Sequence, residues 1–353
     1  MGCWFDPQEL SRWAAAVFQA AGMEGGLAGE LAGILVDADR EGVHTHGLIR
    51  LEEYVPALQR GAWRPTATLT VVQETPATAV VDGGSGVGPV LALRAMERCV
   101  AKARQTGVAV VSLRNGGHFG RAGYYARWAA QQGLIGVAMT NASPCLAPWG
   151  GRQRVLGNNP LAIAVPRRSH PPVVLDMALS VVAQGRIRLA RDRGEMLPEG
   201  WGLDPQGQPT RDPVQVLLGS LMPVGGYKGY GLALMVDLLT GVLSGGAFGT
   251  QVTSARELRQ QNICHTFLAI HVPHFREMDA FLEDVEQLVN MVKGSPPAPW
   301  AQEILLPGEP EQRHAARRGG LVELPEDLCR RIASVAASVG VQQPPPHREG
   351  SHG

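Results

Sequence analysis

The sequence contains few cysteines, and they follow no pattern. Five thiols are scattered along 353 residues, at Cys3, Cys99, Cys145, Cys264 and Cys329. The sequence has no C-x-x-C pair and no cysteine–histidine set at a zinc-binding spacing. Disulfide frameworks and structural zinc sites both depend on such patterns. We therefore expect reduced thiols, a cytoplasmic protein and no metal site.

The sequence also lacks a net charge and long apolar runs. Lysine plus arginine and aspartate plus glutamate each number 32. Nucleic acids and anionic membrane surfaces attract basic proteins, so we expect neither as a partner. No apolar stretch reaches the about 18 residues that a spanning helix needs. The first residues show neither the basic nor the apolar region of a signal peptide.

A Rossmann-type nucleotide fingerprint is absent as well. The glycine-rich stretch 83–88 lies between a predicted strand and a predicted helix, where such a fingerprint would stand. The last glycine of G-x-G-x-x-G would fall on Pro89 or Leu91, and no Walker lysine follows. We interpret the stretch as a turn that leads into a helix, so any NAD(P) site must be built by other means.

The rest of the chain alternates between helical and strand-like segments. Helices are indicated by apolar residues at helical spacing, and strands by β-branched runs between turns. We predict helices over 9–21, 27–39, 51–58, 89–107, 124–133, 232–243, 278–292 and 325–339. We predict strands over 66–72, 77–81, 108–113, 135–140, 162–165, 173–176 and 265–271. The pattern is typical of an α/β protein, the length predicts two domains, and the Pro- and His-rich tail 342–353 indicates disorder.

The first group of residues that suits chemistry lies between His44 and Arg50. If residues 47–58 are helical, His46 and Arg50 lie four residues apart and share one face. A guanidinium grips a carboxylate through two parallel hydrogen bonds. An imidazole beside it binds the neighbouring oxygen or transfers a proton. The pair suits a 2-oxo or 2-hydroxy acid, although Thr45 here also fits a simple helix cap.

The second group is the glycine-rich loop Asn115–Gly120, directly after strand 108–113. It contains His118, and loops on a rigid scaffold often hold catalytic side chains. An imidazole pKa near 6.5 suits reversible proton transfer. A histidine with only a structural hydrogen bond fits this position equally well.

Three further loops, 140–151, 174–180 and 225–231, are rich in small residues. Small residues let a flat ligand approach the backbone, and Lys228 in the last loop suits a phosphate or a ribose. Each loop taken alone is equally typical of a turn.

Together these segments resemble the type-2 malate/L-lactate dehydrogenase family. That family also includes ureidoglycolate dehydrogenase, sulfolactate dehydrogenase, 2,3-diketogulonate reductase and Δ1-piperideine-2-carboxylate reductase. The resemblance extends from about Glu9 to Gly340. It rests on ordered matches at Thr45-His46-Gly47 with Arg50, His118-Phe119-Gly120, 147–151, 157–160, Asp176-Met177-Ala178, 197–201, 226–232 and 306–311.

The resemblance implies a non-Rossmann fold, with a helical domain and a mixed-sheet domain that binds NAD or NADP. Residues 1–75 with 310–341 would form the helical substrate and dimerisation domain, and residues 76–309 the NAD(P)-binding domain. It also implies a homodimer whose active-site cleft is completed by the partner chain.

The resemblance further implies a role for each matched residue. His118 would accept the proton when a small 2-hydroxy acid, such as malate or L-lactate, is oxidised by hydride transfer to NAD(P). His46 and Arg50 would hold the substrate, with Thr45 in support. The cofactor site would be lined by Ser143, Asp176, Met177, Ala178, Lys228, Pro307, Gly308 and Glu309.

Two departures from the family pattern flank these residues. His44 stands where the family often has an acidic residue, and Gly116-Gly117 where serine or asparagine usually precedes the catalytic histidine. The identity of the substrate and the preference for NADH or NADPH therefore stay open. Two alternatives also stay open: a reductase of a cyclic 2-imino acid, and a catalytically silent homologue.

Overall fold

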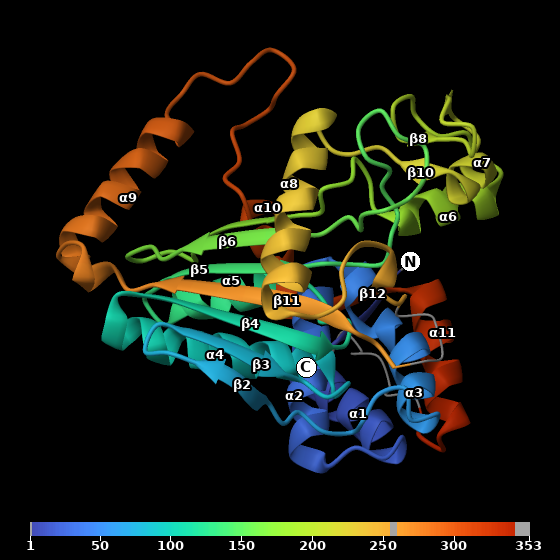
Figure 1. Cartoon of the computed structure of the whole chain (residues 1–353), viewed down its shortest axis with the longest axis horizontal. Coiled ribbons are helices and arrows are strands. Elements are labelled where there is room, and N and C mark those ends of the chain that lie inside the picture. Colours follow the sequence, from blue (N-terminus) through green and yellow to red (C-terminus); the bar gives the residue numbers. More distant parts are fainter. Residues whose placement is uncertain (1, 255–259, 343–353) are drawn as a thin grey trace, which may run out of the picture.

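The centre of the protein is a seven-stranded mixed sheet, seen in a computed structural model that describes residues 2–254 and 260–342 (Figure 1). Its strand order is β2-β3-β4-β11-β5-β6-β7, and only β3 and β4 run parallel. The strands are β2 Thr70–Glu74, β3 Thr78–Asp82, β4 Val108–Gly116, β5 Ile135–Thr140, β6 Leu161–Val165, β7 Val173–Met177 and β11 Ile263–Ile270. A mixed sheet of this order is not the parallel, doubly wound sheet of Rossmann proteins, so the predicted fold class is confirmed.

Helices α4 (Gly88–Thr106) and α5 (Ala122–Gln131) cover one face of the sheet. Side chains alternate between the two faces of a strand. Val111 on β4 and Phe267 on β11 point to the face that these helices cover, and both are fully buried in the cluster beneath them. On the other face, the Thr266 hydroxyl donates to the Leu239 carbonyl at 2.7 Å. Helix α8 (Tyr227–Asp237) and the π-helical turn Leu238–Val242 therefore lie on that opposite face.

A group of helices lies at one end of the sheet (Figure 1). It consists of α1 Pro7–Ala20, α2 Gly25–Arg40, α3 Leu51–Gln59 and α11 Glu326–Ser338. Asp6 caps α1 by accepting hydrogen bonds from two backbone amides, and Pro7 follows at the first helical position. Strands β1 (Gly2–Phe5) and β12 (Val322–Pro325) pair antiparallel, which ties the start of the chain to its last helix. The first and last segments of the chain thereby share one apolar core.

The remaining elements lie toward the outside. A small lobe is formed by α6 Gln184–Arg193, β8 Gly202–Leu203, β9 Pro209–Thr210, α7 Pro213–Leu218 and β10 Ser220–Leu221. At the opposite end, α9 (Met278–Lys293) is followed by a long connection to α10 (Glu309–Ala315) (Figure 1). Short 3-10 helices cover 44–46, 48–50, 249–251, 272–274 and 317–320. No helix within the described ranges is both long and apolar enough to cross a bilayer.

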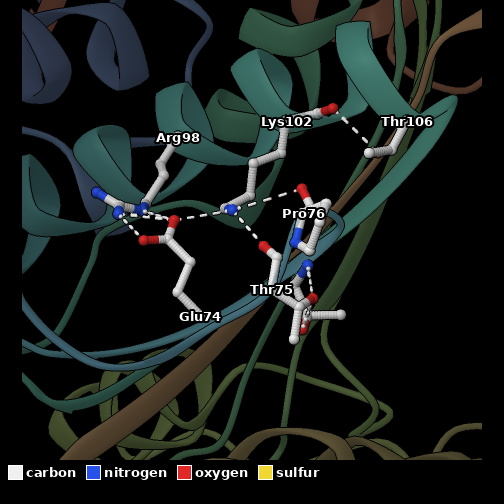
Figure 2. Close-up of polar contacts among 7 residues, drawn as sticks. Glu74, Thr75, Pro76, Arg98, Lys102 and Thr106 are labelled. Atoms are coloured by element: carbon white, nitrogen blue, oxygen red, sulfur yellow. Dashed lines mark hydrogen bonds and ion pairs between the residues drawn. The ribbon is translucent and has the colours of Figure 1, made fainter.

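The edge strand β2 is held to α4 by charged side chains (Figure 2). Every residue of β2 is exposed, so apolar burial holds the strand only weakly. The Glu74 carboxylate lies 2.8 Å from both Arg98 Nη2 and Lys102 Nζ, and Lys102 also donates to the Thr75 carbonyl at 2.6 Å. Hydrogen bonds from Lys102 and Arg98 hold the pKa of Glu74 below its usual value.

The predicted helix over residues 51–58 is confirmed, but it does not extend back to residue 47, which was the condition for His46 and Arg50 to share a helix face. Residues 44–46 and 48–50 form two short 3-10 helices, which are separated by Gly47 with an extended ψ of −146°. Helix α3 begins only at Leu51. His46 and Arg50 therefore do not share a helix face, and their proximity has a different cause.

Candidate active site

A buried carboxylate of α2 shapes the turn that carries His46 and Arg50. Asp39 is fully buried, and its Oδ2 accepts a hydrogen bond from the Leu48 amide at 2.6 Å. Its other oxygen lies 2.8 Å from His44 Nδ1. Burial raises the pKa of Asp39, while the hydrogen bonds to His44 and Leu48 oppose that shift. Asp39 therefore fixes both ends of the turn around His46.

The turn brings His46 against His118, which lies in the loop after β4. The two imidazole rings stack, with centroids 5.9 Å apart and planes inclined by 15°. His118 Nδ1 lies 2.7 Å from the hydroxyl oxygen of Tyr54 on α3. Tyr54 in turn packs against Trp63, with ring centroids 4.3 Å apart. The helical group and the sheet thus each contribute one histidine to the same place.

Arg50 completes this cluster. Its Nη1 donates to Glu53 Oε2 at 2.7 Å, and 18% of its side chain is exposed. Its buried Nε has no hydrogen-bond partner among the residues that the structure describes. Thr45 is exposed, and its hydroxyl lies 3.0 Å from His46 Nδ1.

Burial and the Arg50 charge keep both imidazoles neutral. Burial and the charges of Arg50 and Arg121 lower the pKa of His46 to about 3. Burial, Arg50, His46 and His265 lower the pKa of His118 well below its usual value. A neutral imidazole accepts a proton, and a nearby guanidinium binds an anion. The cluster can therefore bind an organic acid and exchange a proton with it.

The residues expected at the cofactor begin at the end of β7, next to the His118 loop. Asp176 Oδ2 accepts a hydrogen bond from the Gly123 amide at 2.9 Å, and Gly123 lies at the start of α5. The same oxygen lies 3.6 Å from Arg121 Nε. Met177 pairs with Leu161 of β6, and Ala178 follows it. This strand end and the loop that carries His118 are thereby neighbours.

Lys228 lies in the first turn of α8, whose start suits a phosphate. Two glycines with positive φ, Gly225 and Gly226, lead into the helix, and no side chain within residues 2–254 and 260–342 caps it. Lys228 is exposed. Free backbone amides at a helix start and an ammonium group together bind phosphate well. The donor set here fits the diphosphate of a dinucleotide.

Two further connections place the other expected cofactor residues. The Val224 amide donates to the Leu179 carbonyl at 2.9 Å, which joins the α8 start to the segment after β7. The Pro307 carbonyl accepts from the Val174 amide at 3.1 Å, which places Pro307 and Gly308 against β7. Ser143 is partly buried in the loop after β5.

The Glu309 carboxylate is already engaged within the chain. Partial burial raises its pKa, but hydrogen bonds from the Leu306 amide and Lys293 lower it to about 2. Lys293 Nζ lies 2.9 Å from both carboxylate oxygens. Any contact of this residue with a ligand would have to compete with that ion pair.

Sequence reasoning missed several residues around this site. Tyr54 follows Arg50 by four residues, and its position on α3 was a usable signal. Gln261, just before β11, and His265, within it, contact the loop of His118 from a distant part of the sequence, and no local pattern indicated them. Arg121 forms an ion pair with Glu41, and no spacing in the sequence predicts this contact.

Most of the chain matches a known family. Residues 5–333 match the family model described as malate/L-lactate dehydrogenase. The chain is 41% identical over 283 residues to a malate dehydrogenase of Pyrococcus abyssi, which covers 78% of each chain. It is 38% identical to a (2R)-3-sulfolactate dehydrogenase (NADP(+)) of Chromohalobacter salexigens, with 94% of this chain and 97% of that chain covered.

A third relative and a solved structure support the same family assignment. A ureidoglycolate dehydrogenase (NAD(+)) of Escherichia coli is 34% identical, with coverages of 90% and 91%. The solved sulfolactate dehydrogenase of Methanocaldococcus jannaschii superposes with a TM-score of 0.89 at 36% identity, covering 96% of this chain and 98% of that one. The named relatives thus include both NAD- and NADP-dependent enzymes, and the chain belongs to the malate/L-lactate dehydrogenase family.

Proposed function

We propose that this protein is an NAD(P)-dependent dehydrogenase that interconverts a small 2-hydroxy acid, such as malate or L-lactate, and its 2-oxo acid. The observation that supports this most is the cluster of His46, His118 and Arg50, in which two neutral imidazoles lie beside a guanidinium. The guanidinium suits the binding of the substrate carboxylate, and a neutral imidazole suits removal of the proton from the adjacent C2 hydroxyl.

In this proposal, Arg50 binds the substrate carboxylate and His46, supported by Thr45, binds the neighbouring oxygen. His118 accepts the hydroxyl proton during oxidation and returns it during reduction. The Tyr54 hydroxyl and the Gly120 amide both contact His118 Nδ1, at 2.7 Å and 3.3 Å, and hold the ring in place while it exchanges that proton. Burial raises the pKa of Tyr54, so its hydroxyl stays protonated and serves as a fixed partner for the ring.

NAD(P), when bound, supplies the hydride chemistry at C2 of the substrate. The residues that would hold it are Ser143, Asp176, Met177, Ala178, Lys228, Pro307, Gly308 and Glu309. The uncapped start of α8 and Lys228 would bind its phosphates. The adjacency of Asp176 and the His118 loop supports a cofactor site next to the substrate site.

A panel of acids tests this function. Oxidation of NADH and of NADPH is followed with pyruvate, oxaloacetate, 3-sulfopyruvate and Δ1-piperideine-2-carboxylate. Turnover with one of the 2-oxo acids is expected. Turnover only with the cyclic imino acid would replace the proposal with an imine reductase, and cofactor binding without any turnover would indicate a silent homologue.

We further propose that the protein acts as a homodimer, and that α8 with its π-helical turn contributes to the contact. Leu232, Met235, Leu239 and Val242 recur at helical spacing, and each is 44–49% exposed. Exposed apolar faces of this kind mark interaction surfaces. Light scattering after gel filtration should give twice the chain mass, and Leu239→Lys should shift it toward the monomer. A wild-type monomer would refute the dimer.

The predicted division into a helical unit, residues 1–75 with 310–341, and a cofactor unit, residues 76–309, remains part of this proposal. It is supported by separate apolar clusters in the helical group and under the sheet, whereas β2, at the end of the first segment, pairs with β3 of the sheet.

A further inference from the structure

The peptide bond before His118 is held at both of its polar atoms. The His118 amide donates to Gln261 Oε1 at 2.6 Å. The Gly117 carbonyl, which belongs to the same peptide group, lies 3.1 Å from His265 Nε2. Gln261 precedes β11 and His265 is its third residue, so one short segment supplies both contacts.

His265 is itself fixed in place. It is fully buried, and its ring lies parallel to Phe119, with centroids 4.5 Å apart and an angle of 3°. Its Nδ1 lies 2.7 Å from the Thr140 hydroxyl. Because a carbonyl can only accept, Nε2 must carry the ring hydrogen, and Nδ1 then accepts from Thr140. Burial lowers the pKa of His265 to about 3, which keeps the ring in this neutral form.

The two glycines before His118 leave room for this arrangement. A Cβ on Gly116 would lie 2.8 Å from His265 Nε2, and a Cβ on Gly117 would lie 2.8 Å from the indole of Trp63. Real Cβ atoms do not approach other atoms so closely. Gly116 is therefore a condition of the contact with His265, and Gly117 is a condition of the packing of Trp63 against this loop.

We propose that His265 and Gln261 are positioning residues that clamp the Gly117–His118 peptide and thereby set the direction of the His118 ring. The orientation of a peptide plane determines where the next side chain leaves the backbone. Displacement of a catalytic group by about 1 Å can cost about 10²-fold in rate. The clamp rests on the proposed function, because it treats His118 as the group that transfers the proton.

A matched pair of substitutions at His265 tests the clamp. The glutamine amide of His265→Gln reaches the place of Nε2 and can still donate to the Gly117 carbonyl. The asparagine amide of His265→Asn reaches only the place of Nδ1. We expect His265→Asn to lower kcat about 10- to 100-fold with KM and the Kd for NAD(P)H unchanged, and His265→Gln to retain most of the activity. His271→Asn, the same change just beyond β11, serves as the control.

Equal impairment of the two variants, or wild-type kcat in both, would overturn the clamp. If His265→Asn does not fold, Gln261→Leu removes the other contact and decides the matter. Lowered kcat at wild-type Tm then supports the clamp, and wild-type kcat refutes it.

A readout without turnover separates the clamp from the proposed function. Imidazole ¹⁵N NMR, with the His118 signals assigned by their loss in His118→Ala, reports the hydrogen bond between His118 and Tyr54. Those signals should shift in His265→Asn and remain in place in His265→Gln. If the wild type turns over no acid, the proposed function fails, while this comparison still decides whether the clamp exists. Unshifted signals in His265→Asn would refute it.

Discussion

Two buried polar regions of this protein are built on opposite principles. One is the ion cluster between α2 and α5. There Arg121 pairs with Glu41, Arg127 pairs with both Glu41 and Asp37, and all four side chains are at most 18% exposed. Each guanidinium in it meets a carboxylate of the chain itself. This cluster joins the helical group to the sheet and needs no ligand.

The other region is the histidine site. Burial lowers the pKa values of His46 and His118, and neighbouring positive groups lower them further. Arg50 acts on both rings, Arg121 acts on His46, and the imidazoles of His46 and His265 act on His118. Arg50 has a carboxylate partner in Glu53, and its Nε lacks a hydrogen-bond partner among the described residues, as do the Nε atoms of Arg121 and Arg127. The comparison teaches that the first region contains only permanently charged groups paired with one another, whereas the second places two neutral bases beside a guanidinium, an arrangement suited to an acid from outside.

The largest expected effect comes from removing the base of the histidine site. We expect His118→Ala to lower kcat about 10²–10⁴-fold, as is typical for a lost general acid/base. The Kd for NAD(P)H, measured by fluorescence titration, should stay unchanged because the substitution leaves the cofactor segments intact. Wild-type turnover in this variant would exclude His118 from proton transfer.

Breaking the ion cluster should affect stability instead of chemistry. Glu41→Gln leaves two buried guanidinium groups underpaired, and removing one partner of a buried ion pair costs about 3–5 kcal/mol. Urea unfolding should show this loss, while kcat of the folded enzyme changes little. Glu74→Gln is the matched control, since Glu74 makes its two ion pairs at the surface (Figure 2) and such pairs contribute little. Equal losses in the two variants would contradict the distinction between buried and exposed pairs.

Arg50→Lys should weaken substrate binding more than it slows chemistry. Lysine keeps the charge but loses the two-pronged grip on a carboxylate. A hydrogen bond to a charged group contributes about 1.5–3 kcal/mol, so KM should rise roughly 10- to 100-fold. Steady-state kinetics with the best acid of the panel measures this. An unchanged KM would place the substrate carboxylate elsewhere.

The smallest effect is a change in the pH dependence of stability. His46 binds a proton near pH 6.5 when unfolded but only near pH 3 when folded. The unfolded chain therefore binds more protons than the folded protein between pH 6.5 and pH 3. The contribution of His46 to the free energy of unfolding is complete above pH 6.5 and is lost as the pH falls toward 3. Urea unfolding between pH 7.5 and 4.5 should show a shallower decline for His46→Gln than for the wild type. Identical slopes would show that His46 is not buried in neutral form.

The long periodic elements could be predicted from the sequence because their signals are local. The apolar spacing within α2 and α4 indicates helices, and the β-branched run in β4 indicates a strand. The pairing of β1 with β12 joins residues about 320 positions apart, and two four-residue strands have no pattern of their own. Such contacts are set by tertiary packing, which no local window contains.

The candidate site divides in the same way. His46, Arg50 and His118 could be singled out as candidates from residue types that suit an acid substrate. The helical arrangement considered for His46 and Arg50 is not observed, because the Leu48 amide donates a hydrogen bond to Asp39 and residues 44–46 and 48–50 form 3-10 turns. The contacts from Gln261 and His265 could not be predicted, since β11 inserts between β4 and β5 from a distant part of the sequence.

The most direct test of the central claim is whether His118 takes up a proton when an acid binds. Oxamate, an unreactive isostere of a 2-oxo acid, is titrated into the NADH complex at pH 7 in buffers of different ionisation enthalpy. Calorimetry then gives the number of protons bound per site. The proposed mechanism requires that the bound carboxylate raise the pKa of His118, so uptake should approach one proton in the wild type and vanish in His118→Ala. Binding without proton uptake in the wild type, or equal uptake in both proteins, would contradict it.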